Sequence, residues 1–141
     1  ALTVDDRKMP DINMQHMCAV MLLDGTATFE AAHDEPRMRD KKTRDLRARV
    51  ELIGDATWER QHPGRQGTVE VLLKDGTRLR HHTTAVRGTS ENPMTRQEVD
   101  DKCHALMTPV LGARKSRSLC DTVWNLEAMK DVRELGQMLR A

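Results

Sequence analysis

An unbroken apolar run, Met17–Leu23, is the feature of this sequence that most constrains its fold. Pro10 and Asp11 precede the run, and both suit the first turn of a helix. Gly25 follows it and suits the left-handed position just past a helix end. The pattern predicts a helix from about Asp11 to Leu23. A helix that is apolar on every side must be enclosed by other structure, so this segment requires a surrounding core.

The rest of the chain offers little material for such a core. Of its 141 residues, 32% are charged and only 2% are aromatic. Nine methionines supply much of the apolar volume, and methionine fills irregular gaps and adaptable interfaces without specifying a rigid interior. We therefore expect another polypeptide to supply part of the enclosing core.

Charge and cysteine usage limit the possible classes of protein. The 23 basic and 22 acidic side chains leave a net charge of +1, which gives no general attraction to nucleic acid or to a membrane surface. No apolar run approaches the ~20 residues of a membrane span, and the first residues lack a signal-peptide pattern. Cys18, Cys103 and Cys120 are widely spaced and odd in number, which favours reduced thiols. We expect a cytoplasmic protein.

The remaining patterns predict an α+β fold. Asp40 suits the N-cap of a helix to about Arg49, with Arg44, Arg47 and Arg49 on its solvent side. The strongest local signal is a β-hairpin over 68–84, turning at Asp75-Gly76. The other predicted elements are a helical turn (29–33), a short strand (50–53) and three C-terminal helices, the first starting with a Thr95/Glu98 capping box and interrupted at Pro109.

His16 is the foremost candidate for chemistry. At helical spacing, Asn13 and His16 share a face with Val20, so two polar groups lie on an otherwise apolar rod. An imidazole titrates where proton transfer at neutral pH is efficient. The alternative interpretation is a core histidine that bonds a backbone carbonyl.

The other polar clusters have weaker patterns. Arg7 can hold a carboxylate of an anionic substrate in two-point fashion, although its acidic neighbours also suit a surface ion-pair cluster. His81 and His82 point to opposite faces of a strand, and the run 33–35 lacks a metal-ligand spacing. We predict no metal site.

The order of several motifs resembles the C-terminal part of the MmgE/PrpD family, which includes 2-methylcitrate dehydratase, cis-aconitate decarboxylase and iminodisuccinate epimerase. The longest match is Met-Pro-Asp-Ile-x-x-Gln-His-x-x-Ala-Val-x-Leu-Leu-Asp-Gly, from Met9 to Gly25. Further matching stretches follow in order: Arg37–Asp40, Leu46–Val50, Val69–Gly76, Arg87–Thr95, Pro109–Gly112, and Trp124 with Leu126-Glu127.

The resemblance implies a fold of two domains. Residues 1–88 would form the later part of an α+β lid domain, and residues 89–141 would return as C-terminal helices of an all-helical domain. An upstream chain would supply most of that helical domain, in a homo- or hetero-oligomer. The family's principal acid and base residues would lie on that upstream part.

The resemblance also implies a function. It indicates a cofactor-free lyase or isomerase that abstracts a proton next to a carboxylate of a small polycarboxylic acid. His16 would be catalytic, where many members carry Tyr in a Ser-x-Pro-Tyr context, and Arg7 and Asn13 would bind substrate. The alternative is a non-catalytic structural or interaction subunit that kept the family fold.

Overall fold

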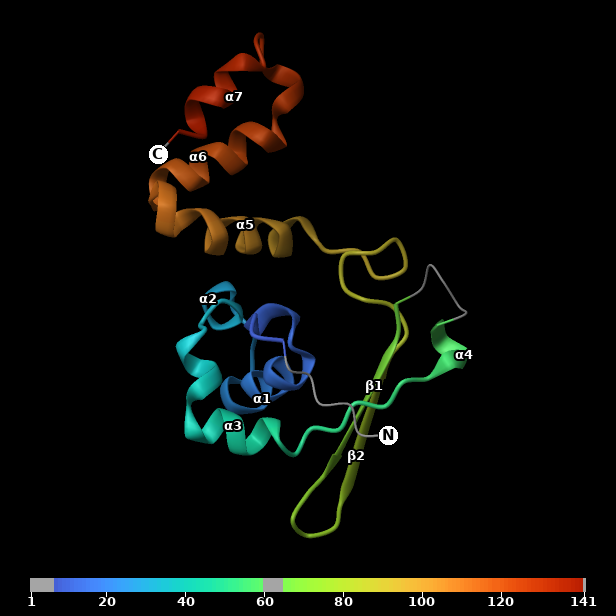
Figure 1. Cartoon of the computed structure of the whole chain (residues 1–141). Coiled ribbons are helices and arrows are strands. Elements are labelled where there is room, and N and C mark those ends of the chain that lie inside the picture. The colour runs from blue at the N-terminus through green and yellow to red at the C-terminus, as the bar shows by residue number, and fades with distance from the viewer. Residues whose placement is uncertain (1–6, 60–64, 141) are drawn as a thin grey trace. The chain divides into compact units, whose positions relative to one another are not determined.

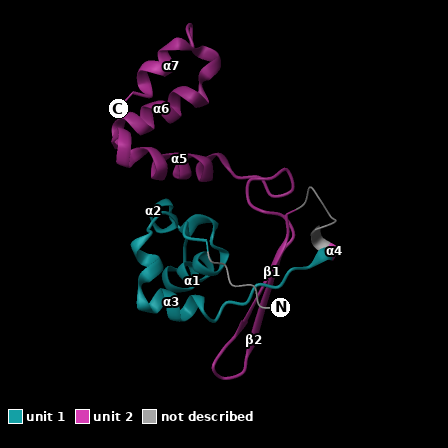
Figure 2. Ribbon diagram, in the orientation of Figure 1, with its two compact units in different colours: residues 1–56 teal, residues 57–141 magenta. Residues whose placement is uncertain are grey.

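The computed structural model describes residues 7–59 and 65–140, and these divide into two compact units, residues 1–56 and 57–141 (Figure 2). The first unit is helical, and the second contains an antiparallel hairpin followed by helices (Figure 1). The predicted α+β class is therefore confirmed. Within the described residues, no helix combines the length and apolar character needed to cross a bilayer.

The first unit is built around helix α1 (Met14–Asp24), which packs against helix α3 (Lys41–Arg47). A short 3-10 helix, η1 (Pro10–Ile12), leads into α1. In the sequence, α1 is followed by α2 (Phe29–Ala32) and by the 3-10 helix η2 (Pro36–Arg39), and α3 comes next. The side chain of Asp40 accepts a hydrogen bond from Thr43 N–H, which confirms the predicted N-cap of α3.

Helix α1 begins three residues later than the sequence pattern predicted. Pro10 and Asp11 belong to η1, and Asn13 is the N-cap of α1 because its side chain accepts a hydrogen bond from His16 N–H. Asparagine is among the preferred residues at this position. At the other end, Gly25 has φ of 73° and its N–H donates to the Met21 carbonyl, so the predicted stop is confirmed.

The predicted strand at 50–53 is wrong, because these residues form no strand. The Val50 carbonyl instead accepts a hydrogen bond from the Gln15 side chain at 2.5 Å. An alternating pattern becomes a strand only where a neighbouring strand pairs with it. In the part of the chain that the structure describes, the only sheet is the hairpin, whose strands pair with each other.

The second unit contains the predicted hairpin. Strands β1 (Gly67–Leu72) and β2 (Arg78–Thr83) pair antiparallel, with Val71 opposite Leu79. The Leu73 N–H donates to the Thr77 carbonyl, and Gly76 takes φ of 87°. These features match a three-residue hairpin loop with glycine in the left-handed position. A short helix, α4 (Ala56–Glu59), precedes the hairpin.

The C-terminal part is helical, with α5 (Arg96–Leu111), α6 (Ala113–Trp124), η3 (Leu126–Ala128) and α7 (Arg133–Met138). The Thr95/Glu98 capping box is present. Pro109 does not interrupt α5, contrary to the prediction: it lies in the last turn, where one lost backbone bond affects little of the helix before Gly112 ends it.

The interior of each unit is small. The buried apolar residues of the described chain are Ala19, Val20, Ala31, Leu119 and Cys120. By contrast, Leu22 on α1 is 56% exposed and Leu79 on β2 is 52% exposed. Of the three cysteines, all of them free thiols, Cys120 is buried and Cys18 and Cys103 are half-buried.

Candidate functional site

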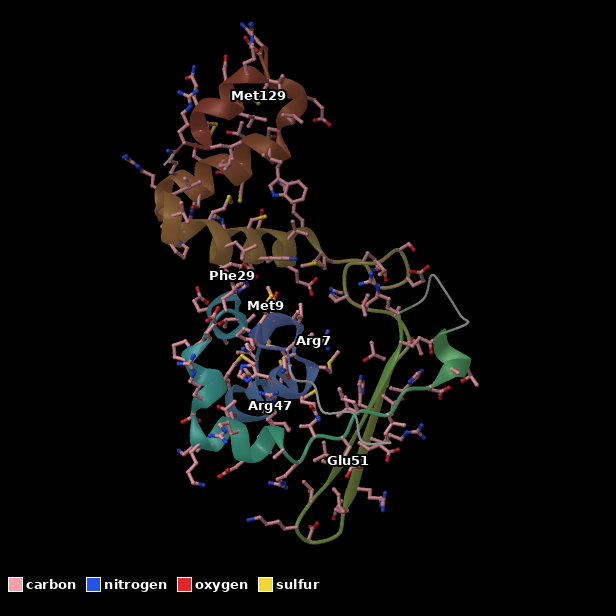
Figure 3. The ribbon with its side chains drawn as sticks, in the orientation of Figure 1. Arg7, Met9, Phe29, Arg47, Glu51 and Met129 are labelled. Carbon is pink, nitrogen blue, oxygen red and sulfur yellow. The ribbon has the colours of Figure 1, made fainter. Side chains whose placement is uncertain are left out.

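The three predicted site residues all belong to the first unit. His16 lies in the first turn of α1, and Asn13 caps that turn. Arg7, which is labelled in Figure 3, lies just upstream of η1. They are connected through Asn13, whose side chain reaches both neighbours. Its Oδ1 accepts from His16 N–H at 2.9 Å, and its Nδ2 donates to the Arg7 carbonyl at 2.9 Å.

Asn13 is completely buried, and both ends of its amide take part in these local bonds. The amide fixes the start of α1 and the approach of the chain to it. It thereby sets the orientation of the turn that carries His16. Its predicted role in substrate binding stays a prediction.

The His16 imidazole is enclosed and polar at the same time. The residue is 0% exposed, and neither Nδ1 nor Nε2 has a hydrogen-bond partner among the residues that the structure describes. A buried polar atom without a partner costs roughly 1–3 kcal/mol, so such atoms are rare in folded proteins. The ring is therefore chemically unsatisfied within the described chain, which argues against the interpretation of a core histidine bonded to a backbone carbonyl.

The surroundings of His16 lower its pKa below the usual value of 6.5. Burial is the largest cause, because it disfavours the charged imidazolium. The positive charges of Arg47 and Arg37 add to the effect, and the negative charge of Asp34 opposes it. At neutral pH the ring is consequently neutral, with one nitrogen able to donate a hydrogen bond and the other able to accept a proton.

Arg37 is held by an acidic partner, Asp24. Its Nη1 and Nη2 donate to the two carboxylate oxygens of Asp24 at 2.6 Å and 2.7 Å. This two-point pair joins η2 to the end of α1, and it lowers the pKa of Asp24. The pair therefore holds the Arg37 guanidinium in place, with the Asp24 carboxylate compensating its charge.

Arg47 is the residue of this site that the sequence analysis missed. It was placed on the solvent side of its helix, yet it is half-buried and its charge acts on the His16 ring. Arg47 is four residues after Thr43 and shares its helix face, and Thr43 is almost fully buried in this unit. The sequence analysis had no signal for the burial of Thr43, so the structure was needed to find Arg47.

Arg7 is exposed, and the bond to Asn13 uses its backbone carbonyl. Its predicted contact with a substrate carboxylate stays a prediction.

Among the described residues, no group of three or more His, Cys, Asp or Glu side chains gathers where a metal ion could bind. His82 contacts Thr68 across the hairpin at 2.8 Å, as expected for a paired strand residue.

Comparison with known proteins adds two findings. Residues 4–127 match the MmgE/PrpD C-terminal domain. The chain is also 26% identical to cis-aconitate decarboxylase of Homo sapiens over 128 residues, which cover 91% of this chain and 26% of that protein. The chain thus spans about a quarter of the length of this curated relative.

Proposed function

Because the chain belongs to the MmgE/PrpD family, we propose that it is the C-terminal segment or small subunit of a cofactor-free lyase or isomerase. The enzyme would abstract a proton next to a carboxylate of a small polycarboxylic acid, in the manner of a 2-methylcitrate dehydratase. The similarity to cis-aconitate decarboxylase supports chemistry of the lyase type. An upstream chain would carry the remaining acid and base residues.

His16 is the observation that carries this proposal. A neutral ring with two unpaired nitrogens can take a proton from carbon at one nitrogen and donate a hydrogen bond to a substrate oxygen at the other. The electron pair left by the proton spreads into the adjacent carboxylate until the leaving group departs. The burial that lowers the pKa of the ring keeps it in the neutral form that can accept a proton.

The proposed test is to express the chain together with the upstream part of a family member and to assay 2-methylcitrate and cis-aconitate. His16→Gln should lower kcat by roughly 10²- to 10⁴-fold, the usual contribution of a general acid or base. His33→Gln is the matched control, because His33 is an exposed histidine of the same unit. Undiminished turnover by His16→Gln would contradict the role given to His16.

His16→Tyr distinguishes two versions of that role. Tyr occupies this position in many members that the sequence resembles, and its hydroxyl can donate a hydrogen bond but is a poor base near neutral pH. High activity of His16→Tyr would indicate a hydrogen-bond donor, and low activity would indicate a base.

A second candidate function is a non-catalytic subunit that kept the family fold. The feature that favours it is the sequence Asn13-Met-Gln-His16, which lacks the Pro and Tyr of the usual pocket motif. An assembled pair of chains that is folded but inactive on both acids would support this alternative.

A further inference from the structure

We propose that Cys103 and Cys120 are a redox-sensitive thiol pair, which a peroxide oxidises to a disulfide that links α5 to α6. Both residues are free thiols, and they lie on the two helices of one helical hairpin. This hairpin belongs to the second unit, whereas His16 belongs to the first. The thiol pair therefore does not depend on the proposed function.

Helices α5 and α6 pack against each other and are joined at Gly112 (Figure 1). At the other end of this hairpin, Trp124 Nε1 donates to Asp100 Oδ1 at 2.5 Å, and the Arg96 guanidinium carbon lies 4.5 Å from the centre of the Trp124 ring. Asp100 and Trp124 are each twelve residues from Gly112. The helices are therefore antiparallel, and residues at equal distances from Gly112 lie opposite each other.

This register places the two cysteines opposite each other, because Cys103 lies nine residues before Gly112 and Cys120 lies eight residues after it. Cys103 follows Asp100 by three residues and so shares its helix face. Cys120 precedes Trp124 by four residues and likewise shares its face. The thiols of Cys103 and Cys120 are in hydrogen-bond contact. Facing side chains in direct contact are the arrangement from which a disulfide forms.

The two thiols differ in their access to solvent. Cys103 is half-buried, whereas Cys120 is only 7% exposed. Burial is the largest cause that raises the pKa of the Cys120 thiol, and the nearby Cys103 and Asp100 add to the effect. Because the thiolate is the reactive form, Cys120 resists direct oxidation. A peroxide therefore reacts first at Cys103.

The oxidation has two balanced steps. In the first, Cys103 Sγ attacks one oxygen of hydrogen peroxide, the O–O bond breaks, and a sulfenic acid and water form. In the second, Cys120 Sγ attacks the Cys103 sulfur, the S–O bond breaks, and the hydroxyl leaves as water with the proton of the Cys120 thiol. The two thiols together supply the two electrons that reduce the peroxide. Dithiothreitol should reverse the product by thiol–disulfide exchange.

Peptide mapping after oxidation tests the pair directly. Trypsin cleaves after Lys and Arg, so the three cysteines fall in three different peptides, 9–37, 103–114 and 118–130. The purified full chain is treated with hydrogen peroxide, and the remaining thiols are alkylated. Mass spectrometry should then find peptide 103–114 linked to peptide 118–130, with a mass lower than their sum by two hydrogens. Dithiothreitol should release both peptides.

Cys18→Ala is the matched control, because Cys18 is the half-buried thiol of the other unit. This variant should form the same link as the parent chain, and Cys103→Ala should form no link and leave Cys120 as a free thiol. Oxidation of Cys103 to a sulfinic acid while Cys120 stays a thiol would overturn the proposal. Links that involve only Cys18, or that join two copies of the chain, would overturn it as well.

Thermal unfolding gives a second readout. A disulfide between facing residues limits the freedom of the unfolded chain, so oxidation should raise the melting temperature by roughly 5–10 °C. The same treatment should leave the melting temperature of Cys103→Ala unchanged, which separates the effect of the link from that of oxidised methionines. A lower melting temperature of the linked parent chain would show that the link distorts the helix pair, and it would contradict the facing arrangement of the two cysteines.

Discussion

At the scale of single residues, His16 combines two properties that rarely coexist. It is fully enclosed, and neither of its ring nitrogens has a partner among the described residues. Most buried polar atoms are paired, because leaving them unpaired costs stability. Such an unpaired ring lies here at the start of a helix, and two arginine charges act on it. This combination is typical of a site that binds a ligand or another chain.

The lowered pKa of His16 predicts a dependence of stability on pH. The unfolded chain binds a proton at this ring near pH 6.5, and the folded chain does so only at lower pH. The contribution of the neutral His16 ring to folding stability is therefore complete above about pH 6.5. It decreases as the pH falls from there toward the folded-state pKa. The urea midpoint of the parent protein should fall more steeply than that of His16→Gln over this interval. If His16→Gln had the same slope as the parent, the enclosed ring would not be the source of the effect.

At the scale of elements, the junction between the hairpin and α5 is fixed by one dense network. The Arg87 guanidinium bonds to the carboxylate of Glu98 and, at 2.7 Å, to the Asn92 side chain. Glu98 also accepts from the backbone and hydroxyl of Thr95. These bonds, the Arg87 contact first among them, lower the pKa of Glu98 to about 2. The cap and the ion pair therefore act as one unit that sets where α5 begins.

Substitution of the cap tests this network. Thr95→Ala should lower the free energy of unfolding by about 1 kcal/mol, the typical value of an N-cap hydroxyl. The stabilisation that depends on ionised Glu98 is present above pH 4.5 and is lost as the pH falls toward 2. The loss of unfolding free energy caused by Thr95→Ala should therefore be smaller in acid. Ser118→Ala, an exposed serine within α6, should change the unfolding free energy little. If Thr95→Ala lowered the unfolding free energy equally at all pH values, the stabilisation by the cap would not depend on Glu98.

At the scale of the whole molecule, large apolar side chains remain uncovered in both units. Leu22 on α1 and the apolar face of the hairpin, with Val69 and Leu79, are each about half exposed. Val71 and Leu79 pair across the strands, so they form a continuous apolar face. The matched relative has roughly three quarters of its length outside this region. We propose that an upstream chain, carrying another part of the family fold, covers these faces.

Association with an upstream chain is the prediction that follows. The two chains, expressed together, should co-purify with a native mass that contains both. Leu79→Glu should weaken the complex, because it places a charge in the apolar face of the hairpin. Arg80→Gln, on the opposite face of the same strand, is the control. A lone 141-residue chain that remains a cooperatively unfolding monomer and ignores the upstream chain would contradict the proposal.

The sequence by itself determined the features that depend on neighbours a few positions away. The hairpin, the Thr95/Glu98 capping box and the stop at Gly25 all agree with the structure, because each signal lies within its own element. The ordered motifs also sufficed to indicate the family, which the match over residues 4–127 confirms.

Only the tertiary structure decided which groups meet. Residues 50–53 have an alternating pattern but no strand beside them, so their outcome depended on distant segments. Arg47 follows the polar side of a helical pattern, and only the packing of α3 on α1 brings its charge to His16. The enclosure of His16 is likewise a product of several segments. Burial and electrostatic environment are sums over residues far apart in the chain, which local patterns do not encode.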